Sequence, residues 1–321
     1  MPLPLSQFID GQHIGLPARD GMRKSVHVID QKSLDAIRAA LVTGRPLLVR
    51  GDPGTGKSQL ARAAAVALKR AFLSHAVDAR TETRDLLWTV DVVSRLACAQ
   101  MLGAVREGDA KKVAESVDVT RFLRPGPLWW AFNWASAAEQ ARLAESSAPV
   151  ADPGEIDAGV VLLVDEIDKA DSSVPNALLD ALGHGRFDVP GGKIVTLNGK
   201  TRPLLVITTN DERVLPDAFL RRCWVLHLEL DANRDKLVST LVERGKAHHE
   251  ELGDLLFDVA NMLADDREKV KARGLTAPGV AEYIDVLDAL HELADTYDER
   301  KKLLARIGEF AFDKHPREPF E

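Results

Sequence analysis

The chain has 321 residues, of which 45% are hydrophobic and 28% are charged, and its formal net charge is −7 at pH 7. This length suffices for one large domain or two smaller ones, and the composition is that of an ordinary globular protein. The negative balance argues against broad adhesion to nucleic acid or to acidic membrane surfaces, and no apolar run is long enough to span a bilayer.

The first residues and the two cysteines indicate where in the cell we expect the protein. Residues 1–5 lack the charged start and the long apolar segment of a secretory leader, so we expect no signal peptide. The two cysteines, Cys98 and Cys223, lie far apart in the sequence. We therefore expect reduced structural thiols in a cytoplasmic protein.

The first predicted elements alternate between helix and strand. Glycine and proline breakers dominate residues 1–23, where we predict mixed structure. Apolar periodicity predicts a helix over 31–42, a buried strand over 46–49, a helix over 59–69 and a strand over 72–77.

The segment 78–157 is harder to interpret. We predict mostly helix over 84–107, a helix starting near Pro127 and a proline-containing loop over 148–158. Three of the five tryptophans, which form either a core stripe or a partner-binding patch, are Trp129, Trp130 and Trp134.

Several strands and one helix are predicted next. The apolar run 160–164 is typical of a strand buried on both faces, as in a parallel sheet. A short helix is expected over 178–182, a hairpin over 187–196 and a further core strand over 204–208. A tight turn at 198–199 separates the last two.

The alternating segment 224–230 closes this region, and helices with charged faces follow it. We therefore predict an α/β core over 1–230, with a helical insertion at about 78–157, and a smaller α-helical domain over 231–321.

A glycine-rich loop stands between the predicted strand at 46–49 and the helix at 59–69. Strand, loop and helix in this order are the context of a phosphate-binding loop, which implies a nucleoside-triphosphate binder. Lys57 can reach the β- and γ-phosphates, and the Ser58 hydroxyl can hold Mg²⁺. The residues expected to bind the nucleotide are Gly51, Asp52, Pro53, Gly54, Thr55, Gly56, Lys57, Ser58 and Gln59.

Two acidic residues follow the apolar strand at 160–164. Ligands of open α/β sheets bind at the carboxyl ends of the strands, where Asp165 and Glu166 lie. We expect Asp165 to help hold Mg²⁺ and Glu166 to activate the attacking water as a general base. The alternative is a solvated acidic turn.

Further candidates follow the next predicted strand. Asn210 is placed to orient a water or contact the γ-phosphate, although asparagine is also a common turn residue. Arg221 and Arg222 end a short helix predicted from about Pro216. They either complement that helix end or act as an arginine finger on a neighbouring subunit's nucleotide, which requires an oligomer.

Taken in order, these motifs resemble the AAA+ ATPases and, within them, the MoxR family. Residues 51–58 correspond to Walker A, residues 160–166 to Walker B, Asn210 to sensor 1 and Arg221-Arg222 to the arginine finger. The hairpin region 185–201 stands where MoxR-like proteins insert a hairpin before sensor 1. The resemblance covers about 33–230 well and the helical remainder weakly.

The resemblance implies a P-loop NTPase fold, a parallel sheet flanked by helices with a C-terminal helical lid. It implies an ATPase that uses ATP and Mg²⁺ in a homo-oligomeric ring, a hexamer by analogy. MoxR-like proteins are similar to chaperones that remodel protein clients, among them von Willebrand A-domain proteins. A nucleotide-controlled switch in bacterial signalling or defence is the alternative, and neither a membrane nor a nucleic acid is an expected partner.

Three assignments stay open. For a sensor 2 residue of the lid, the sequence offers only Lys271 or Arg273. The pair His248-His249 followed by Glu250 suggests metal ligation, but no matching cluster follows in the sequence, which favours a solvated helix. Asp168 and Lys169, near the catalytic edge, are interpreted as surface or subunit-contact residues.

Overall fold

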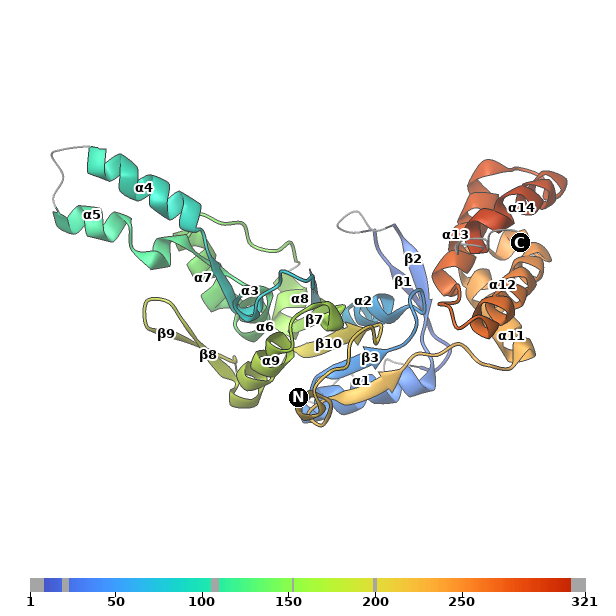
Figure 1. Ribbon diagram of the computed structural model, residues 1–321, viewed down its shortest axis with the longest axis horizontal. Helices are drawn as coiled ribbons and strands as arrows, with labels where there is room; N and C mark the ends of the chain where they lie inside the picture. The colour runs from blue at the N-terminus through green and yellow to red at the C-terminus, as the bar shows by residue number, and fades with distance from the viewer. Residues whose placement is uncertain (1–8, 19–22, 105–109, 152, 199–200, 313–321) are drawn as a thin grey trace. The chain divides into compact units, whose positions relative to one another are not determined.

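The computed structural model describes residues 9–18, 23–104, 110–151, 153–198 and 201–312. It contains a five-stranded parallel sheet formed by β3 (Leu47–Arg50), β4 (Ala71–Ala76), β7 (Val160–Asp165), β10 (Leu204–Thr209) and β11 (Trp224–His227). The strand order is β11-β3-β10-β7-β4. β3, β10 and β7 of this sheet are labelled in Figure 1. The predicted α/β fold class is confirmed.

The central strands are apolar because both of their faces are covered. β7 pairs in parallel with β4 and β10, which places Leu162 opposite Leu73 on one side and Leu205 on the other. The first five residues of β7 and all six of β10 are buried. Continuous apolar runs are what doubly covered strands require, and for this reason the sequence located these strands closely.

Helices and a hairpin accompany this sheet. The helical elements are α1 (Gln31–Thr43), α2 (Lys57–Leu68), the short 3-10 helix η3 (Ile167–Lys169), α9 (Ser173–His184) and α10 (Asp217–Leu220). The antiparallel pair β8 (Arg186–Val189) and β9 (Lys193–Thr196) forms the predicted hairpin. The turn predicted at 198–199 lies partly outside the described residues.

The segment 78–157 contains more than helices. Its elements are α3 (Thr83–Leu87), β5 (Trp88–Val90), α4 (Val92–Ala104), α5 (Ala110–Ser116), η2 (Val119–Phe122), β6 (Leu123–Pro125), α6 (Pro127–Phe132), α7 (Trp134–Leu143) and α8 (Pro153–Ala158). α4 and α5 lie side by side in Figure 1.

The prediction of mostly helix over 84–107 is confirmed for the described residues by α3 and α4. A short strand separates these helices, because Trp88, Thr89 and Val90 pair with β6. The loop predicted over 148–158 was wrong in part. α8 stands where a loop was expected. Its first residue is Pro153, and a proline that looks like a breaker is well suited to the first turn of a helix.

The tryptophans of this segment belong to the core. Trp129 is fully buried and Trp130 is 4% exposed. Trp129 meets Phe187 edge to face, and Trp130 meets Trp134 in the same way. The core interpretation of this cluster is confirmed.

The remaining elements come from the two ends of the chain. Residues 1–23 were expected to be mixed, but β1 (His13–Leu16) pairs in antiparallel fashion with β2 (Ser25–Val28). The C-terminal elements are α11 (Arg234–His249), η4 (Glu250–Leu252), α12 (Leu255–Ala272), α13 (Val280–Leu293) and α14 (Tyr297–Phe312). They enclose their own core, which includes Leu241, Leu263, Tyr283 and Leu287, and α11 packs against β2.

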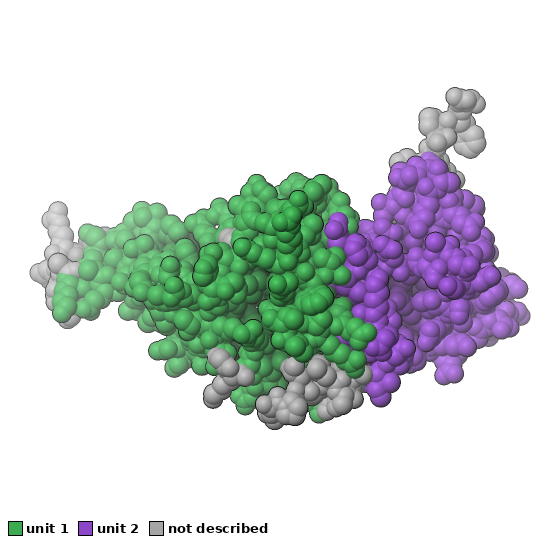
Figure 2. Space-filling view, turned by 90° about the horizontal axis from the view of Figure 1, so that it is seen from below, with its two compact units in different colours: residues 1–5, 35–48, 64–225 green, residues 6–34, 49–63, 226–321 purple. Residues whose placement is uncertain are grey.

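The chain forms two compact units, shown in Figure 2: residues 1–5, 35–48 and 64–225, and residues 6–34, 49–63 and 226–321. The domain boundary near 231 stays a prediction. Both cysteines are free thiols, as expected, and burial raises the pKa of Cys223 to about 12. Among the described residues, no helix has the length and hydropathy needed to cross a bilayer.

Candidate nucleotide site

The glycine-rich loop connects β3 to α2, and α2 begins at Lys57. Gly54 has a φ of 75° and Gly56 a φ of 96°, a left-handed backbone that side chains rarely adopt. Such a turn lets successive backbone N–H groups face one point, and the start of α2 adds partial positive charge there. The local backbone therefore has the form of an anion cradle.

Lys57 lies folded against this loop. Its Nζ donates to the carbonyl oxygens of Gly51, at 2.7 Å, and of Asp52, at 2.9 Å, and the residue is buried. The Thr55 hydroxyl also donates to the Asp52 carbonyl, at 2.9 Å. The ammonium of Lys57 is thus held against the loop that is expected to bind the phosphates.

The C-terminal helices contact the same loop. The Ala281 N–H, at the start of α13, donates to the Gly54 carbonyl at 3.0 Å. At Gly279, an added Cβ would meet backbone atoms of Pro53 and Gly54. The loop is therefore packed directly on the N-terminus of α13.

Arg267 of α12 is a functional candidate that the sequence reasoning missed. Its side chain is 5% exposed, donates to the Pro278 carbonyl and lies 3.9 Å from the Asp52 carboxylate. Burial lowers the pKa of this guanidinium. The available signal was a cation spaced like a core residue, between Leu263 and Val270, on the apolar face of a helix.

A cavity of about 560 Å³ opens beside the loop, within the unit of residues 6–34, 49–63 and 226–321. Nucleotide-sized ligands occupy pockets of roughly 300–1,000 Å³. The loop residues Asp52 and Thr55 line it, and so do the cations Lys32, Arg244, Arg267 and Lys271. Of the two sensor 2 candidates, Lys271 is therefore at the cavity, and Arg267 joins it.

The acidic pair, Asp165 and Glu166, lies in the other unit, which comprises residues 1–5, 35–48 and 64–225. The Thr208 hydroxyl donates to Oδ1 of Asp165 at 2.5 Å and accepts from the Glu166 N–H at 2.9 Å. Glu166 has a left-handed backbone, with a φ of 60°. Thr208 of β10 therefore fastens both acidic residues to the carboxyl end of the neighbouring strand, a role that the sequence did not reveal.

The Glu166 carboxylate is held from two sides. Its Oε1 accepts from Nδ2 of Asn210 at 3.2 Å, and its Oε2 accepts from Nζ of Lys169 at 2.5 Å. The hydrogen bond to Glu166 raises the pKa of Lys169. The structure thus brings Asp165, Glu166 and Asn210 into one cluster.

Asp168 is buried, 2% exposed, so its interpretation as a surface residue was wrong. Its Oδ2 accepts from the N–H groups of Asn210, at 3.2 Å, and Glu212, at 2.9 Å. The carboxylate therefore anchors the backbone that carries Asn210, and this contact spans residues far apart in the sequence.

Arg221 and Arg222 directly follow α10, and both are exposed. Their backbone N–H groups continue the helical hydrogen bonding, to the carbonyls of Asp217 and Phe219. Exposed guanidinium groups at this position are available to another molecule.

By sequence, no protein of curated function is detectably similar to the chain. Similar solved structures include the RuvB Holliday junction branch migration motor of Thermotoga maritima, at 18% identity and a TM-score of 0.41, over 86% of this chain and 67% of that one.

Two further structures are a putative ATPase from Cytophaga hutchinsonii and NtrX from Brucella abortus in complex with ATP. The first is 13% identical with a TM-score of 0.36, over 86% of this chain and 78% of that one. The second is 14% identical with a TM-score of 0.39, over 90% and 53%.

The model of the AAA domain, dynein-related subfamily, matches residues 46–223, which is more than half of the chain and includes the glycine loop, the acidic cluster and both arginines. The chain therefore belongs to the dynein-related subfamily of AAA domains.

Proposed function

We propose that this AAA protein hydrolyses ATP to ADP and phosphate with the help of Mg²⁺. The observation that carries the proposal is the cluster at the carboxyl ends of β7 and β10, where Glu166 lies between Asn210 and Lys169, beside Asp165. A carboxylate held next to an amide is suited to take a proton from a water that the amide orients.

The chain offers suitable groups for both ligands. The left-handed backbone at Gly54 and Gly56 is the kind that turns successive N–H groups toward one point, and backbone N–H groups suit phosphate oxygens. The Ser58 hydroxyl and the Asp165 carboxylate are the hard oxygen donors that Mg²⁺ prefers, and we propose that they hold it. When bound, the ion supplies charge neutralisation at the β- and γ-phosphate oxygens.

The protein's own residues have distinct roles in this proposal. The backbone of residues 51–58 binds the phosphates, and Lys57 exchanges its two carbonyl contacts for phosphate oxygens. Glu166 accepts the proton of the attacking water, and Asn210 positions that water. Asp168 acts through Asn210 by anchoring its backbone.

We further propose that the chain works as a homo-oligomeric ring, a hexamer by analogy, that remodels protein clients. AAA proteins commonly oligomerise, and the exposed Arg222, with Arg221 as its rival, is suited to complete a neighbouring subunit's site. The client class, von Willebrand A-domain proteins among others, rests on the resemblance of the ordered motifs to the MoxR family.

The Glu166→Gln variant tests the proposed chemistry. The amide cannot accept the proton, so we expect kcat for ATP hydrolysis to fall by about 10²–10⁴-fold while ATP binding persists. Steady-state phosphate release and binding of a fluorescent ATP analogue measure the two. The matched control is Glu292→Gln on α13, an exposed residue that should leave both unchanged.

Two results would contradict the proposal. Unchanged turnover in Glu166→Gln would remove Glu166 from the chemistry. Negligible turnover in the wild type, together with nucleotide-dependent binding of a partner, would favour the alternative of a nucleotide-controlled switch.

A further inference from the structure

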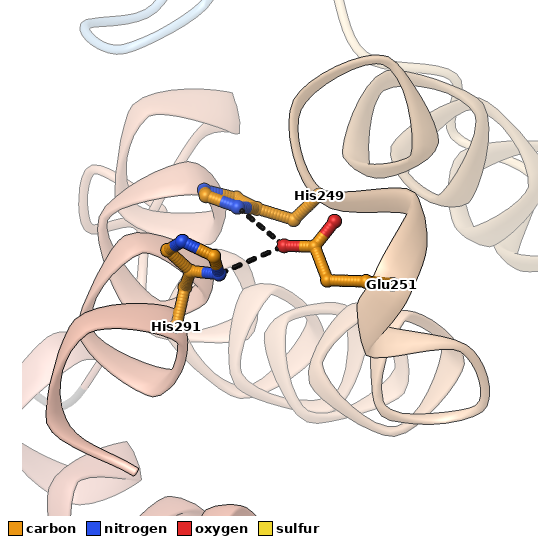
Figure 3. A group of neighbouring side chains, drawn as sticks. All are labelled: His249, Glu251 and His291. Atoms are coloured by element: carbon orange, nitrogen blue, oxygen red, sulfur yellow. Dashed lines mark hydrogen bonds and ion pairs between the residues drawn. The ribbon is translucent and has the colours of Figure 1, made fainter. Parts of the chain in front are cut away.

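A group of metal-binding side chains lies in the C-terminal helices. His249 ends α11, Glu251 lies in the short turn η4, and His291 lies on α13 (Figure 3). Oε1 of Glu251 is 3.2 Å from Nδ1 of His249 and 2.8 Å from Nδ1 of His291. One donor atom from each residue lies within 4.8 Å of the other two.

A fourth residue orients His249. Its Nε2 lies 2.6 Å from Oδ1 of Asp288, one turn before His291 on α13. A carboxylate that accepts the N–H of one ring nitrogen leaves the other nitrogen as a lone-pair donor, which is the usual outer support of a metal-binding histidine. In that tautomer, the lone pair of Nδ1 of His249 faces Glu251.

Nδ1 of His249 and Oε1 of Glu251 lie 3.2 Å apart. In the tautomer that donates Nε2–H to Asp288, both of these atoms are acceptors, because a neutral imidazole has one N–H. A metal ion between them would then accept a lone pair from each. The ring of His291, with its centroid 4.8 Å from that of His249, lies beside the same point.

The donor set and the exposure select a class of ion. Two imidazole nitrogens and one carboxylate oxygen are the ligands of Zn²⁺ sites that keep a fourth position for water. His249 is largely buried, whereas His291 and Glu251 are nearly half exposed, so one side of the group is enclosed and the other is open to solvent.

We propose that His249, Glu251 and His291 bind a divalent transition-metal ion, with Zn²⁺ as the best fit, and that Asp288 positions His249 for it. Zinc bonds of about 2.0–2.1 Å in a tetrahedral arrangement separate neighbouring donors by roughly 3.3 Å. The spacing of His249 and Glu251 already matches this value, and the exposed His291 can adjust by side-chain rotation.

The ion would tie η4 to α13, and therefore the end of α11 to the helix whose N-terminus contacts the glycine loop. This role is separate from ATP hydrolysis and does not depend on it. A bound ion stabilises the fold that presents its ligands, so its effect is measurable without turnover.

The experiment titrates zinc chloride into the full chain, with neither nucleotide nor Mg²⁺ present, and follows binding by calorimetry and unfolding by thermal denaturation. We expect one strongly bound Zn²⁺ per chain and a midpoint raised by about 2–4 °C or more. His291→Ala, at an exposed position, should abolish the shift and weaken binding by at least about tenfold. Asp288→Asn should weaken it by about 10–100-fold.

Two controls make the result specific. His184→Ala removes an exposed histidine that also has an aspartate partner, and it should change neither readout. Asp165→Asn should retain the binding, which separates this site from the carboxylates proposed for Mg²⁺. The proposal is overturned if the wild type binds no Zn²⁺ at micromolar concentration, or if His249→Ala and His291→Ala both bind it as the wild type does.

Discussion

At the scale of single residues, short side chains determine the geometry of the acidic cluster. Thr208 holds Asp165 and the Glu166 backbone, and Asp168 holds the backbone of Asn210. Hydrogen bonds that involve a charged group are the stronger kind, which makes these contacts suitable for positioning. The proposed general base is thus supported by residues whose types are common in ordinary turns.

His27 on β2 is the residue with the clearest expected pH effect. Burial, with the nearby charge of Arg244, lowers its pKa from 6.5 to about 4. The unfolded chain takes up a proton there between pH 6.5 and 4 and the folded chain does not, so acid lowers the free energy of unfolding in this window. The contribution lost is about 3 kcal/mol by pH 4.

We predict that His27→Gln loses less stability than the wild type between pH 6.5 and 4, by up to about 3 kcal/mol. Denaturant unfolding at a series of pH values measures this difference. His184→Gln, at an exposed position, should follow the wild-type curve. Equal slopes for His27→Gln and the wild type would show that His27 does not cause the acid sensitivity.

At the scale of elements, the start of α13 is built to approach the glycine loop closely. Gly279 precedes α13, its N–H donates to the Glu282 carboxylate at 2.8 Å, and Ala281 bonds to Gly54. A side chain at 279 would meet backbone atoms, which cannot rotate away as the end of a long side chain can. A glycine at this position therefore makes the contact possible.

We predict that Gly279→Ala destabilises the chain by about 1–3 kcal/mol, because the loop or the helix must shift to admit the methyl group. Chemical denaturation measures the change. The matched control is Gly183→Ala in α9, where an added Cβ meets nothing within 4 Å. That variant should be neutral or stabilised by about 0.5–1 kcal/mol, since alanine is the better helix former.

If Gly279→Ala had the same denaturation midpoint as the wild type, the close packing of α13 on the loop would be contradicted. A loss in both glycine variants would instead indicate a general cost of the substitution, unrelated to this contact.

At the scale of the whole molecule, the proposed ring predicts that two variants, each inactive alone, regain ATPase activity when they are mixed. An Arg222→Ala protomer retains Glu166, and a Glu166→Gln protomer retains Arg222. An interface is intact where the Arg222→Ala protomer supplies Glu166 and the Glu166→Gln protomer beside it supplies Arg222. In a random equal mixture, about one interface in four has this arrangement. We therefore expect ATPase activity to return on mixing, measured as phosphate release across mixing ratios.

The control replaces the second partner with the double variant Glu166→Gln, Arg222→Ala, which offers no intact finger and should restore nothing. The same series with Arg221→Ala decides between the two arginines. An absence of recovery at every ratio would argue against an arginine acting between protomers.

The sequence by itself determined the elements whose signal is local. The glycine loop, the doubly buried strands β7 and β10, and the acidic pair after β7 were located from short stretches, because backbone turns and continuous apolar runs depend on neighbouring residues. The ordered set of motifs was enough to predict the AAA fold class, which the family match confirms.

Only the tertiary structure decided what depends on residues far apart in the chain. The pairing of β5 with β6, the burial of Asp168 and Arg267, and the meeting of His249 with His291 all join distant segments. A charged residue has the same sequence signature whether it faces solvent or is buried with a partner. The free energy that separates the two cases lies in contacts that form only when the chain folds.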